Sequence, residues 1–303
     1  MIQPVTKLVT IKPVSEQDRS LFVLDTADGR MRLADQLETD INEWCKIAFD
    51  DGPRTHLGAS IIGAECDRQT WYTWRWMKHK VFSGQMQRLF QDGHWYEERF
   101  IEMLRGIGCE VSQVNEAGEQ HRIYACEGHF GGSTDGGMKL PPSYGLDFPF
   151  LAEFKTINDK NFQKVHDVQF DKEQHFGQMC VYGVRLGLKF AVYFLVNKNN
   201  GEMKIEVVAL DWALGQRLID KGQWIITSQR PPAKLSDNAS DWRCKMCDYH
   251  GICQLNQPVD VNCRTCQHSQ AIDNKEWRCN LWNAVIPSKE AMLAGCSSHS
   301  PLL

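Results

Sequence analysis

The residues with the clearest chemical potential are two carboxylates and a lysine near the middle of the chain. Asp135 follows a Gly-Gly-Ser-Thr segment, and Glu153 lies eighteen residues later, two positions before Lys155. Alternate residues of a β-strand point to the same face, so Glu153 and Lys155 are expected to project together, with Phe154 on the opposite face. If the strand that carries Asp135 pairs with the strand that carries Glu153, all three polar groups meet on one face.

Two carboxylates and an ammonium at the edge of a sheet can bind a divalent cation and orient a water molecule beside it. These are the minimum requirements for metal-assisted hydrolysis of a phosphodiester: a Lewis acid, an activated water and a positive charge near the developing negative charge. Oxygen ligands favour Mg²⁺ or Mn²⁺ over softer metals. The competing interpretation is a surface strand with an ordinary alternation of Glu and Lys.

Two helical pairs extend this pattern. His94 and Glu97 are three residues apart in a segment with helical spacing, where such positions share a face, and they offer a third metal ligand. Gln178 and Tyr182 are four apart on a later predicted helix, where the Gln could hold the catalytic strand or a DNA phosphate. Each pair taken alone is also compatible with an ordinary surface.

The elements that must position these residues form an α/β pattern. Hydrophobic periodicity predicts helices over 33–48, 60–80, 85–106, 162–187 and 211–228. It predicts strands over 109–114, 123–126, 131–140, 148–157, 189–197 and 202–210, with short strands within 4–26. The Asn-Asn-Gly turn at 199–201 is typical of a hairpin. Helices, a small sheet with one long helix and a Cys-rich tail together predict an α/β core.

The cysteines of the tail offer a second kind of chemistry. Seven of the twelve cysteines lie between Cys244 and Cys296, and the first three have the spacing C-x2-C-x5-C at Cys244, Cys247 and Cys253. Three thiolates need a fourth, for which Cys66 is the candidate; metal binding would then fasten the tail to an N-terminal helix. Four thiolates can hold zinc or an iron–sulfur cluster, and the spacing alone does not decide between them.

A second cysteine set follows Pro258. The short unit after it is too small to build a core of its own, so that a zinc ion held by Cys263, Cys266, Cys279 and Cys296 would supply folding energy, with His299 as the alternative fourth ligand. Four protein ligands leave no open position, which favours a structural zinc over a catalytic one. Trp277 and Trp282 are expected to shield it.

A basic and aromatic run precedes the predicted catalytic residues. Residues 68–91 contain no acid and interleave aromatic rings with the candidate DNA-binding side chains Arg68, Arg75, Lys78 and Arg88. Such a run suits the phosphates and bases of a nucleic-acid strand. The other interpretation is a helix that packs its Trp residues into the core.

Composition places few limits on the partner but several on the compartment. The net charge is −4, yet residues 1–60 alone carry ten acids against seven bases, so the acid excess lies away from the candidate site and does not exclude DNA. The N-terminus has no apolar signal segment and no stretch is long enough to span a membrane. A cytoplasmic location, bacterial or in a phage-infected host, is expected, where clustered cysteines usually bind metal.

These motifs occur in an order that resembles a known family. The succession G-H-x-x-E, G-x-x-D-G, E-x-K and Q-x-x-x-Y, bracketed by Cys66 and C-x2-C-x5-C, is similar to the PD-(D/E)XK nuclease superfamily over roughly residues 60–255. It is most similar to the RecB-like branch with a 4Fe–4S cluster, which includes CRISPR-associated and phage recombination exonucleases. One departure is that no Pro precedes Asp135.

The resemblance implies a fold and a role for each motif. The fold would be a restriction-endonuclease-like core, a small mixed sheet flanked by helices, with iron–sulfur-stapled helices and a C-terminal zinc-binding unit. Asp135 and Glu153 would bind Mg²⁺ or Mn²⁺ together with His94 or Glu97, and Lys155 would position or activate the water. The four cysteines of the first set would hold a 4Fe–4S cluster and pin the basic and aromatic run beside the DNA path.

The sequence therefore predicts three segments: an accessory segment at 1–59, a nuclease core with its cluster at 60–257 and a zinc-binding unit at 258–303. The predicted activity is a Mg²⁺- or Mn²⁺-dependent DNA exonuclease acting in recombination, repair or phage DNA processing. Expected partners are DNA ends or single strands and a recombination protein, and a homo-oligomer is compatible with the sequence. The alternatives are an endonuclease on the same core and a non-catalytic scaffold that binds DNA ends.

Overall fold

The computed structural model describes residues 24–115 and 118–303. These residues fall into two compact units. The first comprises the described residues up to Gly52 together with Lys80–Trp95, and the second comprises Pro53–His79 together with Tyr96–Leu303. The two units are distinguished by how compactly their residues pack and not by function. The predicted functional segments 1–59, 60–257 and 258–303 therefore stay predictions. Most of the predicted short strands within 4–26 lie outside the described residues.

The first unit contains helix α2 (Ala27–Ala48) and the first half of helix α5 (Gly84–Gly106). Thr26 caps α2 by accepting a hydrogen bond from the amide of Gly29 at 3.0 Å. Arg88 donates to the side chain of Asn42 at 2.7 Å. At position 84 a side chain would collide with the backbone of Asn42, so that glycine is required for this contact between the helices. The helix predicted over 33–48 is confirmed and begins six residues earlier.

The second unit is built on a five-stranded mixed sheet in the order β2-β5-β6-β7-β8. The strands are β2 (Glu110–Ser112), β5 (Gly136–Lys139), β6 (Phe150–Ile157), β7 (Phe190–Asn197) and β8 (Met203–Ala209). Only β6 and β7 run parallel within this sheet. Their connection carries helices α6 (Asp159–Phe162), α7 (Val168–Asp171) and α8 (Glu173–Leu186), as a parallel pair requires. The predicted α/β class is confirmed.

The two central strands are buried on both faces, as their nearly continuous apolar sequences predict. On one face Ala152 and Phe154 pack against the second half of α5, where the rings of Phe100 and Phe154 stack at 5.1 Å. On the other face Leu151 and Tyr193 join a core that includes α8. Alternate positions of β6 therefore face different helices, and the odd-numbered positions face α8.

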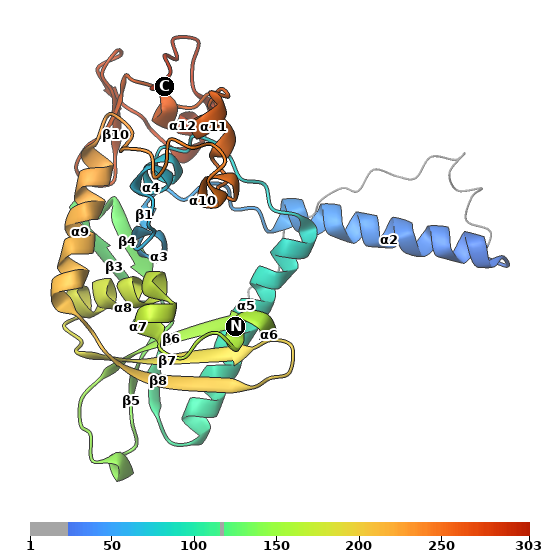
Figure 1. Cartoon of the computed structure of the whole chain (residues 1–303), viewed down its shortest axis with the longest axis vertical. Helices are drawn as coiled ribbons and strands as arrows, with labels where there is room; N and C mark the ends of the chain where they lie inside the picture. The colour runs from blue at the N-terminus through green and yellow to red at the C-terminus, as the bar shows by residue number, and fades with distance from the viewer. Residues whose placement is uncertain (1–23, 116–117) are drawn as a thin grey trace. The chain divides into compact units, whose positions relative to one another are not determined.

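Helix α8 also packs against helix α9 (Trp212–Thr227), with which it makes an extended contact beside the sheet (Figure 1). Gly215 lies on this contact, where a side chain would collide with the backbone of Cys180. Between β7 and β8 the predicted hairpin is present, and Gly201 takes the positive φ of +79° that the turn requires.

A second, three-stranded sheet in the order β1-β4-β3 lies next to α8. Its strands are β1 (Leu57–Gly58), β3 (Arg122–Ala125) and β4 (Phe130–Ser133), and a 3₁₀ turn (Cys126–Gly128) joins the last two. The continuous strand predicted over 131–140 is therefore wrong. Thr134 and Asp135 interrupt it, because β4 pairs with β3 while β5 joins the larger sheet.

The single helix predicted over 60–80 is also wrong. The structure has α3 (Ala59–Ile62) and α4 (Asp67–Trp74), with Cys66 at the N-cap of α4 in extended conformation. After α4 the chain turns at Trp76, whose φ is +51°. The second predicted helix of this region, 85–106, is confirmed as α5.

The Cys-rich tail consists of short elements that belong to the second unit. These are α10 (Trp242–Lys245), α11 (His250–Leu255), a 3₁₀ turn (Cys263–Thr265), β9 (Ser269–Ala271), β10 (Trp277–Cys279), β11 (Ala284–Val285) and α12 (Lys289–Ala294). Another 3₁₀ turn (Pro142–Tyr144) lies between β5 and β6. In the parts of the chain that the structure describes, every helix is too short or too polar to cross a bilayer.

Candidate active site

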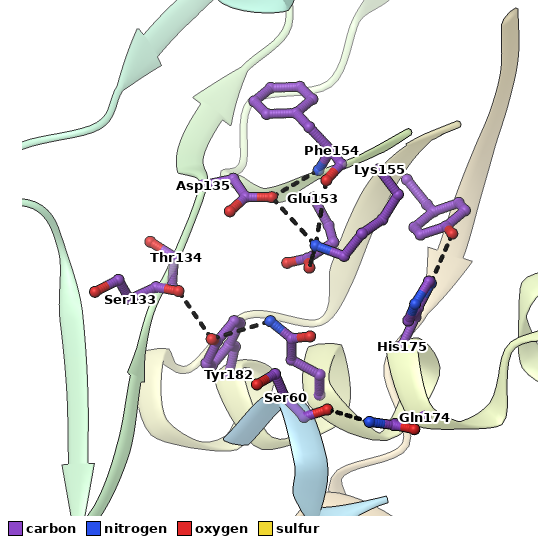
Figure 2. Close-up of polar contacts among 12 residues, drawn as sticks. Ser60, Ser133, Thr134, Asp135, Glu153, Phe154, Lys155, Gln174, His175 and Tyr182 are labelled. Atoms are coloured by element: carbon purple, nitrogen blue, oxygen red, sulfur yellow. Dashed lines mark hydrogen bonds and ion pairs between the residues drawn. The ribbon is translucent and has the colours of Figure 1, made fainter. Parts of the chain in front are cut away.

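Strand β6 places Glu153 and Lys155 on the face that looks toward α8, as the alternation predicted. Their side chains form an ion pair through the ammonium of Lys155 and Oε1 of Glu153 (Figure 2). Lys155 also approaches Oδ2 of Asp135 at 3.6 Å. The ammonium therefore lies between the two carboxylates, and the predicted convergence of the three groups is confirmed.

Asp135 reaches this position from the break between β4 and β5 rather than from within a strand. Its Oδ2 accepts a hydrogen bond of 2.8 Å from the amide of Phe154, on the neighbouring strand β6. The pairing of Gly136 with Ala152 places Asp135 opposite Glu153 in the register of the sheet. A residue outside the regular ladder leaves an amide of β6 unpaired, and the Asp135 carboxylate satisfies it.

Glu153 is completely buried. Apart from its ion pair with Lys155, neither carboxylate oxygen has a hydrogen-bond partner among the described residues. A buried carboxylate without donors is costly, and such groups in native proteins are paired with a charge or coordinate a metal. The unpartnered Oε2 of Glu153 fits a divalent cation.

A third carboxylate, Glu97 on helix α5, belongs to the same electrostatic cluster. Burial, followed by the negative charges of Asp135 and Glu153, raises the pKa of Glu97 to about 7. Burial and Asp135 likewise raise the pKa of Glu153 to about 7. For Lys155 burial alone would lower the pKa, but Glu153 and Asp135 outweigh it and raise the pKa. Three carboxylates thus share one ammonium, and an additional cation would relieve their repulsion.

His94 lies one helical turn before Glu97 on α5 and is exposed. It belongs to the first compact unit, whereas Glu97 belongs to the second with the other site residues. Glu97 is therefore the member of the pair that the structure brings to Asp135 and Glu153, and a metal-binding role for His94 stays a prediction.

Gln178 and Tyr182 are buried on α8 and support the strand end before Asp135. The hydroxyl of Tyr182 donates to the carbonyl of Ser133 at 2.8 Å, and the amide of Gln178 donates to that hydroxyl at 3.1 Å (Figure 2). Gln178 thus acts on the strand through Tyr182, and its contact with a DNA phosphate stays a prediction.

The sequence did not predict that two further residues, His175 and Tyr193, lie near Lys155. His175 and Tyr193 share a hydrogen bond of 2.8 Å between the imidazole Nδ1 and the phenol hydroxyl. Tyr193 lies on β7 directly opposite Glu153, and burial, Lys155 and Lys172 lower the pKa of His175 to about 4. The only sequence signal was that His175 stands three residues before Gln178 on the same helix.

The four cysteines of the first set line one cavity of about 200 Å³. Cys66 enters it from the N-cap of α4, Cys244 and Cys253 from α10 and α11, and Cys247 from the turn between them. The same segments are tied together by an ion pair of 2.6 Å between Arg243 and Glu65. The four cysteines that are predicted to fasten the tail to α4 therefore line the same cavity.

The four cysteines of the second set line another, much smaller cavity of about 20 Å³, and His299 lines it as well. Trp277 is buried, whereas Trp282 also lines the cavity but is largely exposed. In the described ranges no three His, Cys, Asp or Glu side chains converge closely enough to form a finished metal-binding group. The side chains of each thiol set thus line one cavity, and those of the carboxylate cluster lie near one another, but in none of the three groups are the donor atoms at metal-binding distance from a common point.

The basic and aromatic run follows the core-packing interpretation in its first half. Trp71, Trp74 and Trp76 are buried. Arg75 is buried as well and donates to Gln229 at 2.8 Å, so its predicted contact with DNA is wrong: the guanidinium lies inside the protein.

The remaining members of the predicted DNA-binding set differ in their surroundings. Arg68 is half-buried and donates to the carbonyl of Pro232 at 2.9 Å. Lys78 is exposed, and Arg88 is half-buried in the first unit. Their contact with DNA stays a prediction.

No protein-family profile and no curated protein sequence matches the chain. Among solved structures the chain is similar to an alkaline exonuclease, LHK-Exo, from Laribacter hongkongensis, with 16% identity and a TM-score of 0.41 over 60% of this chain and 90% of that chain. LHK-Exo in complex with dAMP matches with 14% identity and a TM-score of 0.39 over 56% and 86%. SSO0001 matches with 13% identity and a TM-score of 0.39 over 73% and 96%.

Proposed function

We propose that the chain is a divalent-metal-dependent nuclease that hydrolyses phosphodiester bonds at DNA ends. The observation that carries this proposal is the fully buried carboxylate of Glu153: its Oε1 pairs with Lys155, which also approaches Asp135, and its Oε2 has no partner among the described residues. Such a group has little use in a structural role, because replacing it by an apolar residue would remove the cost of its burial. A cation-dependent reaction gives it a use.

Glu153, Asp135 and Glu97 are the residues that would hold Mg²⁺ or Mn²⁺. Their donor atoms are the carboxylate oxygens that these ions prefer. When bound, the ion would act as a Lewis acid on the phosphate and lower the pKa of an attacking water. Oδ2 of Asp135 is held by the amide of Phe154, which leaves Oδ1 as its available oxygen.

Lys155 supplies the positive charge that the transition state needs. About a quarter (26%) of its side chain is exposed, so that a phosphate outside the sheet can reach it, while Glu153 is enclosed behind it. Two carboxylates hold the ammonium in place and keep it protonated. We assign to Lys155 the neutralisation of charge on the phosphate and the orientation of the attacking water.

Gln178 and Tyr182 are positioning residues in this account. The hydroxyl of Tyr182 donates to the backbone carbonyl of Ser133, and Gln178 donates to that hydroxyl. Their contribution is to fix the direction from which Asp135 enters the site, and a small misplacement there is costly to a metal-assisted reaction.

We further propose a 4Fe–4S cluster at Cys66, Cys244, Cys247 and Cys253. Four thiols around one cavity are the donor set that such a cluster uses. The chain's own residues already join the same segments, since Tyr249 donates to the hydroxyl of Thr73 on α4 at 3.0 Å. The role of this centre would be structural: it would fasten α10 and α11 to α4.

The partner class is DNA, at ends or as single strands, with a recombination protein as a second partner and a bacterial or phage-infected cytoplasm as the setting. Exonuclease action is tested by incubating the full chain with end-labelled linear DNA and with covalently closed circular DNA, with Mg²⁺ or Mn²⁺. We expect degradation of the linear DNA alone. Equal cleavage of the circle would assign the core to an endonuclease, and no cleavage of either in the presence of both ions would contradict the proposal.

A further inference from the structure

Two arginines are buried side by side where the tail packs on α4. Arg75 and Arg264 are both fully buried. Each lies against indole rings: Arg264 is 4.0 Å from the ring centroid of Trp76 and 4.6 Å from that of Trp277, and Arg75 is 5.3 Å from the ring centroid of Trp277. Trp277 is thus contacted by two guanidinium groups.

Their hydrogen-bond partners are neutral. Arg264 donates to the carbonyls of Trp74 at 3.0 Å and Thr55 at 2.5 Å. Arg75 donates to Gln229 and to the carbonyl of Ser269. Among the residues with described positions, no carboxylate pairs with either arginine, and the Nε of both lacks a partner. Two buried like charges without a counter-charge are strongly unfavourable.

Both arginines adjoin the second cysteine set. Arg264 lies in the 3₁₀ turn between Cys263 and Cys266, and Trp277 lies two residues before Cys279 on β10. Arg75 reaches the same region, because it donates to the carbonyl of Ser269, a residue that lines the cavity of these thiols. The amide of Ser300 donates to Sγ of Cys266 at 3.5 Å.

The space among these thiols suits one small particle. Cys263, Cys266, Cys279 and Cys296 all line the same cavity of about 20 Å³. This is close to the smallest volume that holds a single water molecule. The cavity is therefore large enough for one ion and too small for an organic cofactor or an iron–sulfur cluster.

We propose that Cys263, Cys266, Cys279 and Cys296 hold one zinc ion, and that the resulting anionic centre is the counter-charge of Arg75 and Arg264. Zinc binds four thiolates tetrahedrally, and a divalent ion with four thiolates keeps two excess negative charges. Two guanidinium groups beside it restore neutrality. The centre is separate from the proposed nuclease site and does not depend on that activity.

This arrangement gives each partner a reason to be buried. The zinc-bound turn presents Arg264 to the indole rings of α4 and the following turn, and Asn262 adds a hydrogen bond of 3.1 Å to the carbonyl of Trp76. The arginines in turn favour the thiolate form that the metal requires. Loss of the metal would leave the two charges uncompensated, so metal binding and docking of the tail on α4 are coupled.

Metal analysis of the full chain tests the site. The chain is produced in zinc-supplemented medium, and zinc and iron are measured together per mole of protein. We expect about one zinc per chain, lost in Cys266→Ser and Cys279→Ser and retained in Cys45→Ala, a cysteine outside both sets. Wild-type protein without zinc, or full zinc content in both serine variants, would overturn the proposal.

Loss of zinc through misfolding is distinguished by a second measurement. Cobalt replaces zinc in the wild-type chain, and the difference in visible absorption between the cobalt and zinc forms reports thiolate ligation in a tetrahedral site. Cys296→Ser, an exposed position, is expected to keep the ion with a weaker thiolate-to-cobalt band. A band unchanged in Cys296→Ser but altered in His299→Ala would replace Cys296 by His299 as the fourth ligand and contradict the four-thiolate centre.

The counter-charge is tested by zinc competition with a chelator. Arg75→Met keeps the length of the side chain and removes its charge, whereas Arg75→Lys keeps the charge. Substitutions beside metal ligands typically weaken binding about 10- to 100-fold, and we expect a loss of this size in Arg75→Met and a smaller one in Arg75→Lys. Equal zinc affinity in wild type and Arg75→Met would contradict the charge relationship.

Discussion

The hydroxyl of Tyr182 donates a hydrogen bond of 2.8 Å to the carbonyl of Ser133, so helix α8 holds the strand end from which Asp135 enters the site. Space for this contact exists because residue 132 is glycine; any Cβ there would collide with the Tyr182 hydroxyl. Tyr182 thus determines where Asp135, the proposed metal ligand, lies.

Removing this hydroxyl is expected to loosen Asp135. Tyr182→Phe leaves the half-buried carbonyl of Ser133 without this donor, which costs about 1 to 3 kcal/mol of unfolding free energy. Because the ligand is displaced rather than removed, we expect a kcat reduced about tenfold, with the residual activity rising with Mg²⁺ concentration. Urea unfolding and initial rates of DNA degradation measure both effects.

The glycine at position 132 supplies a matched test. Gly132→Ala is expected to destabilise the chain by about 1 to 3 kcal/mol through overpacking against Tyr182. In the double variant with Tyr182→Phe the colliding oxygen is absent, so the two losses should be less than additive. Strict additivity would show that the two positions are not in contact in the way described.

Glu97 gives a pH dependence of stability with a definite sign. Its pKa is raised from 4.5 to about 7 by burial and neighbouring carboxylates, so the folded chain holds a proton that the unfolded chain releases. This contribution to stability is complete below the unfolded pKa and is lost as the pH rises through about 7.

Without added divalent ions, wild type should therefore lose about 1 to 3 kcal/mol relative to Glu97→Gln between about pH 5 and pH 8. Added Mg²⁺ should restore the stability of wild type at the upper pH and have little effect on the variant. Denaturant unfolding at several pH values provides the measurement. Parallel pH profiles for the two proteins would show that Glu97 ionises as it does in water.

The acid limb of the activity profile is expected to come from carboxylates and not from histidine. The pKa of His175 is lowered to about 4 by its burial and by Lys155 and Lys172, so this imidazole is neutral throughout the range in which Glu97 and Glu153 titrate. His175→Gln should leave the position of the acid limb unchanged, whereas Glu97→Gln should move it. A shift of the limb in His175→Gln would mean that the histidine carries the titration.

Iron content and colour test the first cysteine set. Anaerobically purified wild type should be brown and contain about four iron atoms per chain, and Cys66→Ala should be colourless. Cys109→Ala, which changes a buried cysteine outside both sets, should keep its colour. An intact visible spectrum in Cys66→Ala would exclude Cys66 as a ligand.

Much of the fold and the convergence of Asp135, Glu153 and Lys155 could be predicted from local sequence. Strand alternation correctly placed Glu153 and Lys155 on one face and Phe154 on the other, because a strand's period is independent of its tertiary context. The break at Asp135 could not be predicted, since it arises where β4 and β5 join different sheets. Whether a Gly-rich segment continues or divides depends on which strands are available to pair with it.

The surroundings of the arginines could not be predicted from local sequence either. A basic run with aromatic residues indicates a nucleic-acid surface, yet Arg75 is buried because Trp277 and Gln229 arrive from parts of the chain far away in sequence. His175 and Tyr193 were missed for a related reason: a helix and a strand bring them together beside Lys155, and neither carries a local motif. Contacts of this kind are decided by packing between distant segments.

The most direct test of the central claim is the rate of Mg²⁺- or Mn²⁺-dependent degradation of end-labelled linear DNA by Lys155→Ala. The control is Lys139→Ala, which changes an exposed lysine on the neighbouring strand β5. With the secondary structure and the unfolding transition of both variants intact, we predict a loss of at least about a thousandfold for Lys155→Ala and near wild-type activity for Lys139→Ala. Wild-type activity in Lys155→Ala would contradict the account.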